Sequence, residues 1–156
     1  MAERPRVVFD CNVFLLAAAR QKSVAASCFN LAEKGHIQLF ISKEVLLEIE
    51  DVLNRPEVRA IFPDLSDEIV GAFVKRLRKF ADFSSQVPRR FIYRRDEGDE
   101  PYINLAIEVG AQFLVSRDKD LLDLMTSYAD DCKEFRQRFR TLKVIEPLEL
   151  LSSIEN

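Results

Sequence analysis

The sequence predicts an α/β fold, a three-layer α/β/α sandwich in which helices cover both faces of a central parallel β-sheet. Short, continuously apolar runs such as 7–9 and 113–115 alternate along the chain with longer segments of helical periodicity. Strands that are buried on both faces read as uninterrupted apolar runs, as these do. Crossovers between consecutive parallel strands are expected to be right-handed.

Each element of the sandwich has a local signal. Ser23 and Ser42 are good N-caps, Gly35 can end a helix, and Pro101 suits a first helical turn. The expected strands are 7–9, 37–41, 87–93, 112–115 and 142–145. The expected helices are 13–20, 24–34, 43–53, 66–83, 101–109 and 118–125, with a terminal helical turn after 147.

Composition bounds the class of protein. With 156 residues, 47% hydrophobic and 31% charged, the chain is expected to form one soluble globular domain over 1–156. Its apolar stretches are too short to cross a bilayer, and no signal peptide is expected, so the cytoplasm is the predicted location. A net charge of -3 does not by itself indicate nucleic-acid binding. The three cysteines form no CxxC pair, which argues against a disulfide framework and a zinc site.

Four acidic residues are placed where they could meet. Asp10 and Asp118 each follow an expected strand, and the carboxyl ends of parallel strands carry ligand-handling residues in α/β folds. Asp99 precedes one expected helix, and Glu48 lies inside another. Converging carboxylates repel one another unless a divalent cation balances them. The arrangement therefore indicates metal-assisted phosphodiester chemistry.

Five motifs occur in a fixed order along the chain. They are Phe9–Phe14, Ser42–Leu53, Arg55–Pro56, Arg95–Pro101 and Ser116–Leu122. Together they resemble the PIN-domain family, in particular its branch of toxin components from toxin–antitoxin systems. The resemblance covers roughly residues 7 to 150, and it is carried by the ordered set, since each motif alone is weak.

The resemblance implies a metal-dependent endoribonuclease with Mg²⁺ or Mn²⁺ as cofactor. The family's catalytic and metal-binding acids map onto Asp10, Glu48, Asp99 and Asp118. Its auxiliary positions map onto Asn12, Ser116, Asp120 and Asp96. An RNA substrate, a small antitoxin protein as partner and a homodimer are implied in the same way.

Three positions depart from the family pattern. Cys11 stands where a threonine is usual, and Gly98 stands where the branch often has another acid. Arg117 replaces a small glycine beside Asp118, so it could bind a substrate phosphate or compete with the metal ion.

Substrate contact would need further cations, although for most of them a solvated basic face is the alternative. The candidates are Arg89, Arg90, Arg94, Arg95, Lys133, Arg136, Arg138 and Arg140.

Simpler interpretations exist for each acid and for the whole chain. Asp10 and Asp118 could be helix caps, Asp99 could favour a helix N-terminus, and Glu48 could be a solvated helix residue. A phosphatase of the haloacid dehalogenase type is one alternative function, although its second acid is replaced by Asn12, which cannot act as a general acid. A non-catalytic PIN scaffold that binds RNA or protein is the other.

Overall fold

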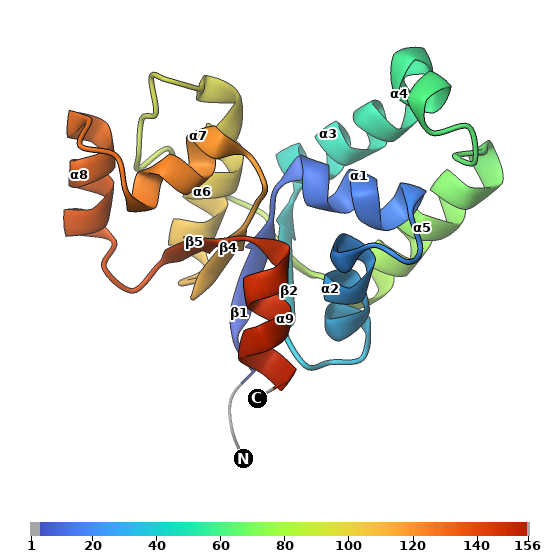
Figure 1. Ribbon diagram of the computed structural model, residues 1–156, viewed down its shortest axis with the longest axis horizontal. Helices are drawn as coiled ribbons and strands as arrows, with labels where there is room; N and C mark the ends of the chain where they lie inside the picture. Colours follow the sequence, from blue (N-terminus) through green and yellow to red (C-terminus); the bar gives the residue numbers. More distant parts are fainter. Residues whose placement is uncertain (1–3, 156) are drawn as a thin grey trace.

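A five-stranded parallel sheet runs through the middle of the protein, whose residues 4–155 are described by a computed structural model (Figure 1). The strands are β1 (Arg6–Phe9), β2 (Gln38–Ser42), β3 (Asp82–Ser84), β4 (Phe113–Val115) and β5 (Lys143–Ile145). Their order is β3-β2-β1-β4-β5, and every neighbouring pair is parallel. The predicted α/β class with a central parallel sheet is confirmed.

Helices lie on both sides of these strands, with α1 to α5 on the right of Figure 1 and α6 to α8 on the left. The α-helices are α1 (Cys11–Ala19), α2 (Val24–Glu33), α3 (Lys43–Asn54), α4 (Pro56–Ile61), α5 (Asp67–Phe80), α6 (Glu100–Glu108), α7 (Lys119–Leu122), α8 (Asp130–Arg138) and α9 (Pro147–Glu155). Two short 3₁₀ turns are η1 (Glu97–Asp99) and η2 (Asp123–Met125). Within the part of the chain that the structure describes, no helix is long and apolar enough to cross a membrane.

The middle strand explains why the sheet forms where it does. Val7, Val8 and Phe9 are completely buried, because helices cover both faces of β1. The register pairs Val7 with Phe113 and Phe9 with Val115, so β1 and β4 end together. The strand order changes direction between these two strands, and in open α/β sheets such a switch point is where ligands bind. The residues after Phe9 and Val115 therefore share the carboxyl edge of the sheet.

The prediction of a third strand at 87–93 is wrong. The third strand is β3 at Asp82–Ser84, and the helix expected over 66–83 ends at Phe80 to allow it. The segment 87–93 is extended, with Phe91 and Tyr93 buried and Ile92 exposed between them, which produced the strand-like pattern. Its backbone groups are bonded to side chains of α6 instead of a neighbouring strand.

Two helices were not predicted. Helix α4 begins at Pro56, directly after α3 ends, and it buries no residue completely. Helix α8 buries only Cys132 and Phe135. Both were missed because a helix with so small an apolar face gives almost no periodic signal in the sequence.

Candidate metal centre

Two strand ends are tied together by a chain of hydrogen bonds. Asp10 follows β1, is 4% exposed, and caps α1 by accepting a hydrogen bond from the Val13 amide at 3.0 Å. Ser116 follows β4, is completely buried, and donates its hydroxyl proton to Asp10 Oδ2. The same hydroxyl oxygen accepts a hydrogen bond from the Asp118 amide at 2.8 Å. Ser116 therefore fixes the Asp10 carboxylate and the backbone at Asp118 relative to each other.

Four carboxylates lie close together beside this chain of bonds. Asp96, Asp99, Asp118 and Asp120 each offer one oxygen, and the four oxygens lie within 4.8 Å of one another. Asp99 reaches the group from η1 at the start of α6, and Asp118 caps α7 by accepting from the Asp120 amide at 3.0 Å. Asp99 Oδ2 is buried and has no hydrogen-bond donor among the described residues. An orphan carboxylate oxygen of this kind marks a position that a cation would satisfy.

The crowding shifts the protonation of two of the acids. Burial raises the pKa of Asp10 from 3.8 to about 6, against the lowering effect of the hydrogen bond from Ser116. Burial and the nearby Asp118, Asp96 and Asp10 carboxylates raise the pKa of Asp99 from 3.8 to about 8. Without a cation, Asp99 therefore favours its neutral form up to about pH 8 and Asp10 up to about pH 6, and a divalent ion would reverse that preference.

Asp120 is already neutralised by a side chain of the protein. Arg95 Nε donates to Asp120 Oδ1 at 2.7 Å, and Arg95 Nη2 donates to Asp123 Oδ2 at 2.6 Å. Hydrogen bonding to Asp123 raises the pKa of this guanidinium further above its ordinary value. Arg95 was proposed from the sequence as a contact to RNA, but the structure commits it to these two carboxylates. It therefore ties the segment before η1 to α7 and η2.

Glu48 is not one of the four clustered carboxylates, and its bonding partner is a tyrosine. It projects from α3 and accepts a hydrogen bond from the hydroxyl of Tyr102 on α6. Burial raises the pKa of Tyr102 above its ordinary value, so this hydroxyl keeps its proton and remains the donor. Cys11 lies beside this pair, and burial together with the Glu48 charge raises the pKa of its thiol to about 12. The thiol that replaces the usual threonine is therefore neutral near pH 7.

Asn12 and Arg117 lie on the outer side of the site. Both side chains are exposed, and with Leu15 and Leu16 they line a shallow pocket of about 290 Å³ on α1. Among the described residues, no ion pair occupies Arg117, and Asn12 donates no side-chain hydrogen bond to Asp10. Arg117 is thus free to meet an incoming anion next to Asp118.

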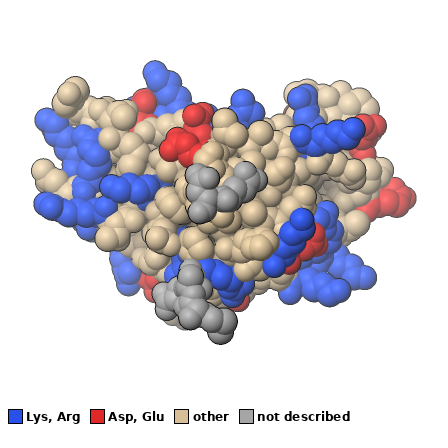
Figure 2. Space-filling model, turned by 60° about the horizontal axis from the view of Figure 1, so that its bottom comes forward, with Lys and Arg blue, Asp and Glu red and all other residues tan. Residues whose placement is uncertain are grey.

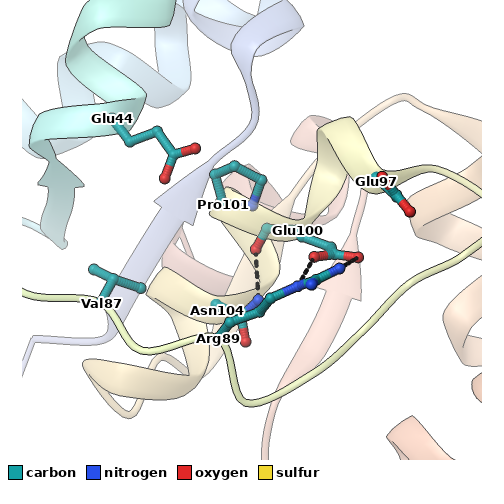
Figure 3. A pocket seen from close by; sticks show the side chains of 7 residues that line it. All are labelled: Glu44, Val87, Arg89, Glu97, Glu100, Pro101 and Asn104. Carbon is teal, nitrogen blue, oxygen red and sulfur yellow. Dashed lines mark hydrogen bonds and ion pairs between the residues drawn. The ribbon is translucent and has the colours of Figure 1, made fainter.

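A second pocket of about 360 Å³ lies against the N-terminal end of α6 and is lined by Glu44, Val87, Arg89, Glu97, Glu100, Pro101 and Asn104 (Figure 3). The Arg89 guanidinium lies across it and contacts both carboxylate oxygens of Glu100, at 2.6 and 3.1 Å. Glu100 is 6% exposed, and its ion pair holds its pKa below the ordinary value. Glu100 Oε2 also accepts from the Tyr93 amide at 2.9 Å. Three polar residues of this pocket, Arg89, Glu100 and Asn104, therefore hold the segment 89–93 against α6.

The structure thus separates the residues predicted from the sequence into three groups. Asp10 and Ser116 form the bonded base of the site, and Asp96, Asp99, Asp118 and Asp120 provide the clustered oxygens. Glu48 is nearby through Tyr102, while Asn12 and Arg117 lie outside. Sequence reasoning missed Tyr102 as the partner of Glu48 and Arg95 as the partner of Asp120, because neither pair has a spacing that predicts contact.

The donor set fits a hard divalent cation. Among the described residues, the clustered ligand atoms are all carboxylate oxygens, which Mg²⁺ and Mn²⁺ prefer, and neither histidine nor a thiolate joins them. The raised pKa values and the unsatisfied Asp99 oxygen both show that ionised carboxylates are disfavoured here, a cost that a bound cation would offset. The residues therefore suit such an ion without determining which one.

Comparisons with known proteins identify the family of the chain. A sequence model described as the PIN domain matches residues 6–120, a stretch that contains Asp10, Glu48, Asp99 and Asp118. An uncharacterized protein of Methanocaldococcus jannaschii is 29% identical over 152 residues, which cover 96% of this chain and 92% of that protein. PIN domains are generally nucleases and typically use divalent metals. Because the matched stretch covers most of the chain, the protein belongs to the PIN-domain family.

Proposed function

We propose that this protein is a Mg²⁺- or Mn²⁺-dependent endoribonuclease that hydrolyses phosphodiester bonds of RNA. The observation that carries the proposal is the convergence of carboxylates at the switch point of the sheet, where one buried oxygen of Asp99 finds no donor within residues 4–155. A PIN-domain chain with this donor set has what divalent-metal phosphodiester chemistry requires.

Each side chain has a role that follows from its position. Asp10, Asp99 and Asp118 would hold the metal ion, which when bound would polarise the scissile phosphate and lower the pKa of the attacking water. Ser116 keeps Asp10 in one orientation by donating to Oδ2, while the Val13 amide holds Oδ1. Glu48, oriented by Tyr102, would accept a proton or bind water at the edge of the site. Arg117 would hold a non-bridging phosphate oxygen.

Asp118→Asn tests the proposal. Asparagine keeps the side-chain oxygen that caps α7 but removes the charge, so the fold is expected to persist while metal-dependent cleavage falls by at least about 10²-fold. Cleavage of a panel of RNAs is measured with Mg²⁺ or Mn²⁺ and with EDTA. Asp64→Asn is the matched control, because Asp64 is exposed and lies between α4 and α5.

Two results would contradict the assignment. If Asp118→Asn cleaves RNA at the rate of the control, Asp118 takes no part in metal-dependent cleavage. Release of phosphate from small phosphomonoesters, with RNA left intact, would replace the nuclease with a phosphatase.

We propose in addition that the nuclease is the toxin of a toxin–antitoxin pair. The support is the resemblance of the ordered motifs to that branch of the family, which also suggests a homodimer and a small antitoxin as partner. Expression of the wild-type chain alone is expected to arrest growth, and co-expression of the protein encoded by the adjacent gene is expected to relieve the arrest. Normal growth on expression of a nuclease-active chain would contradict the toxin role.

A further inference from the structure

Helix α8 separates its charges by face. Asp130, Asp131 and Glu134 line a hollow together with three arginines, and within it Arg138 pairs with Glu134 at 2.7 Å. The opposite face carries residues spaced three, one and three apart, which places them on the same side of the helix and its C-terminal end. They are Lys133, Arg136, Gln137 and Arg140. One face is therefore internally neutralised, and the other is basic.

The basic face lines a pocket of about 280 Å³ with Lys143 from the start of β5. We call Lys133, Arg136, Gln137, Arg140 and Lys143 the α8 basic face. It contains four cations and no acid, and within the described residues none of the four takes part in an ion pair, although eight other arginines of the chain do. Figure 2 shows blue side chains gathered at the end of the molecule that carries α8, whereas blue and red alternate at the opposite end.

Local helix energetics do not account for this grouping. A cation near a helix C-terminus is stabilised by the helix dipole, which explains a basic residue such as Arg136. Lys133, however, lies near the start of α8, where the dipole opposes a positive charge, and Lys143 belongs to a strand. Arg136 also has a structural role, since its guanidinium donates to the carbonyl oxygens of Leu124 and Ser127 at 2.8 Å.

An exposed aromatic side chain lies beside the same face. Tyr128, in the segment between η2 and α8, is 84% exposed. The Lys133 ammonium lies 5.9 Å from the centre of its ring, so the ring and the cations share one surface. Cations that follow a backbone together with an aromatic ring on which a base can stack are the features of surfaces that bind single-stranded nucleic acid.

We propose that the α8 basic face and Tyr128 bind single-stranded RNA outside the metal centre. Phosphates lie over Lys133, Arg140 and Lys143, and one base stacks on Tyr128. Only α7 and η2 separate Asp118 from the start of this surface along the chain. The inference rests on the proposed nuclease function and deepens it, because it makes the substrate a single strand held at a second point.

The test measures binding without cleavage. All proteins carry Asp118→Asn, EDTA is present, and the probe is a fluorescein-labelled oligouridylate of about 12 nucleotides followed by anisotropy. The variant Lys133→Gln with Arg140→Gln and Lys143→Gln leaves the structural Arg136 intact. Its matched control removes three exposed lysines elsewhere, Lys22→Gln with Lys75→Gln and Lys79→Gln.

The expected result has three parts. The α8 variant binds at least about tenfold more weakly than the control, and the slope of log affinity against log salt concentration falls by about 2, since each phosphate contact on a single strand contributes about 0.7. Tyr128→Ala weakens binding about tenfold without changing that slope. Double-stranded RNA of the same length binds the wild-type face more weakly than the single strand.

Other outcomes separate this inference from the nuclease assignment. Equal binding by the α8 variant and its control overturns the inference, and it leaves metal-dependent cleavage to be judged by its own assay. Polyglutamate could instead compete for the face as strongly as RNA does, with no effect of Tyr128→Ala. That result would assign the face to an acidic protein segment and would also overturn the inference. If the single strand binds through this face but the wild-type protein cleaves no RNA in the metal-dependent assay, the RNA contact is supported and the nuclease assignment is rejected.

Discussion

Asp99 lies where an isolated carboxylate is unstable. Its buried Oδ2 has no donor in the part of the chain that the structure describes, and the charges of Asp118, Asp96 and Asp10 add to the cost of ionising it. Stability and function therefore make opposite demands at this residue, as is common where charged groups are gathered to hold a ligand. The conflict can be measured because a single amide substitution removes it.

Asp99→Asn is expected to stabilise the metal-free protein near pH 8. The amide is uncharged and can donate to a neighbouring carboxylate, so the repulsion is replaced by a hydrogen bond. A gain of about 1 kcal/mol would raise the Tm by about 2–4 °C in a domain of this size. Differential scanning calorimetry in EDTA measures the shift, and the same variant is expected to gain less stability from added Mn²⁺ than the wild type does. A lower Tm for the variant in EDTA would show that the Asp99 carboxylate is already balanced by another group.

Residue-scale features of the site were predictable only in part from the sequence. Asp10 and Asp118 follow apolar runs, so their placement at strand ends could be anticipated from the adjacency of parallel strands. The ion pair of Arg95 with Asp120 joins residues 25 apart, and the bond from Tyr102 to Glu48 joins residues 54 apart. No local pattern encodes such pairs, because the fold brings them together.

The segment before η1 shows how an element can be positioned without belonging to the sheet. Asn104 on α6 is 4% exposed, and its Oδ1 accepts from the Arg90 and Phe91 amides, each at 2.8 Å. Its Nδ2 donates to the carbonyl oxygens of Phe91 and Glu100. One side chain therefore supplies the bonds that a neighbouring strand would have made. This segment leads directly to Asp96 and Asp99, so Asn104 positions part of the acidic cluster.

Asn104→Ala is expected to destabilise the protein by about 2 kcal/mol, because the buried Phe91 amide loses its acceptor and the Arg90 amide keeps only the Pro88 carbonyl. Urea unfolding followed by circular dichroism measures the loss. Limited proteolysis is expected to cut the variant within 88–96 sooner than the wild type. The matched control is Asn30→Ala on α2, an exposed asparagine in a helix, whose effect is expected to stay within about 0.5 kcal/mol. Equal losses for the two variants would mean that Asn104 does not anchor the segment.

At the scale of helices and strands, the sequence predicted those elements whose apolar residues recur with a clear period. The strands expected at 37–41, 112–115 and 142–145 lie within one residue of β2, β4 and β5. The strand expected at 87–93 was wrong because Pro88 has no amide proton and the amides of Arg90, Phe91 and Tyr93 found acceptors on a helix. Tertiary partners of this kind decide between a strand and an extended loop, and they are absent from a local window of sequence.

The whole molecule combines an acidic centre with a separate basic surface under a net charge of only -3. The raised pKa values of Asp10 and Asp99 determine whether the free energy of unfolding rises or falls with pH. Asp10 and Asp99 keep protons in the folded protein that the unfolded chain releases near pH 4. Their contribution to the free energy of unfolding therefore falls as the pH rises, from about pH 4 to about 6 for Asp10 and up to about 8 for Asp99.

The metal-free protein is expected to have a lower Tm near pH 8 than near pH 5, and Mn²⁺ is expected to raise the Tm more near pH 8. The metal ion binds deprotonated carboxylates, so its stabilisation grows as the protons leave. Glu100 does not oppose this trend, because its lowered pKa affects stability only at lower pH. Thermal melts in EDTA and in Mn²⁺ across this range provide the measurement. A Tm that is flat or rises from pH 5 to pH 8 in EDTA would contradict the raised pKa values.

The central position of β1 has a consequence for biosynthesis. β1 is the first strand to be made, and one of its edges stays unpaired until β4 has been synthesised. β4 ends at Val115, and Asp118 follows three residues later. Because chains emerge from the ribosome amino end first, most of the polypeptide is translated before its carboxylates can meet. A nascent chain built in this way therefore cannot assemble the proposed metal centre until its own synthesis is nearly over.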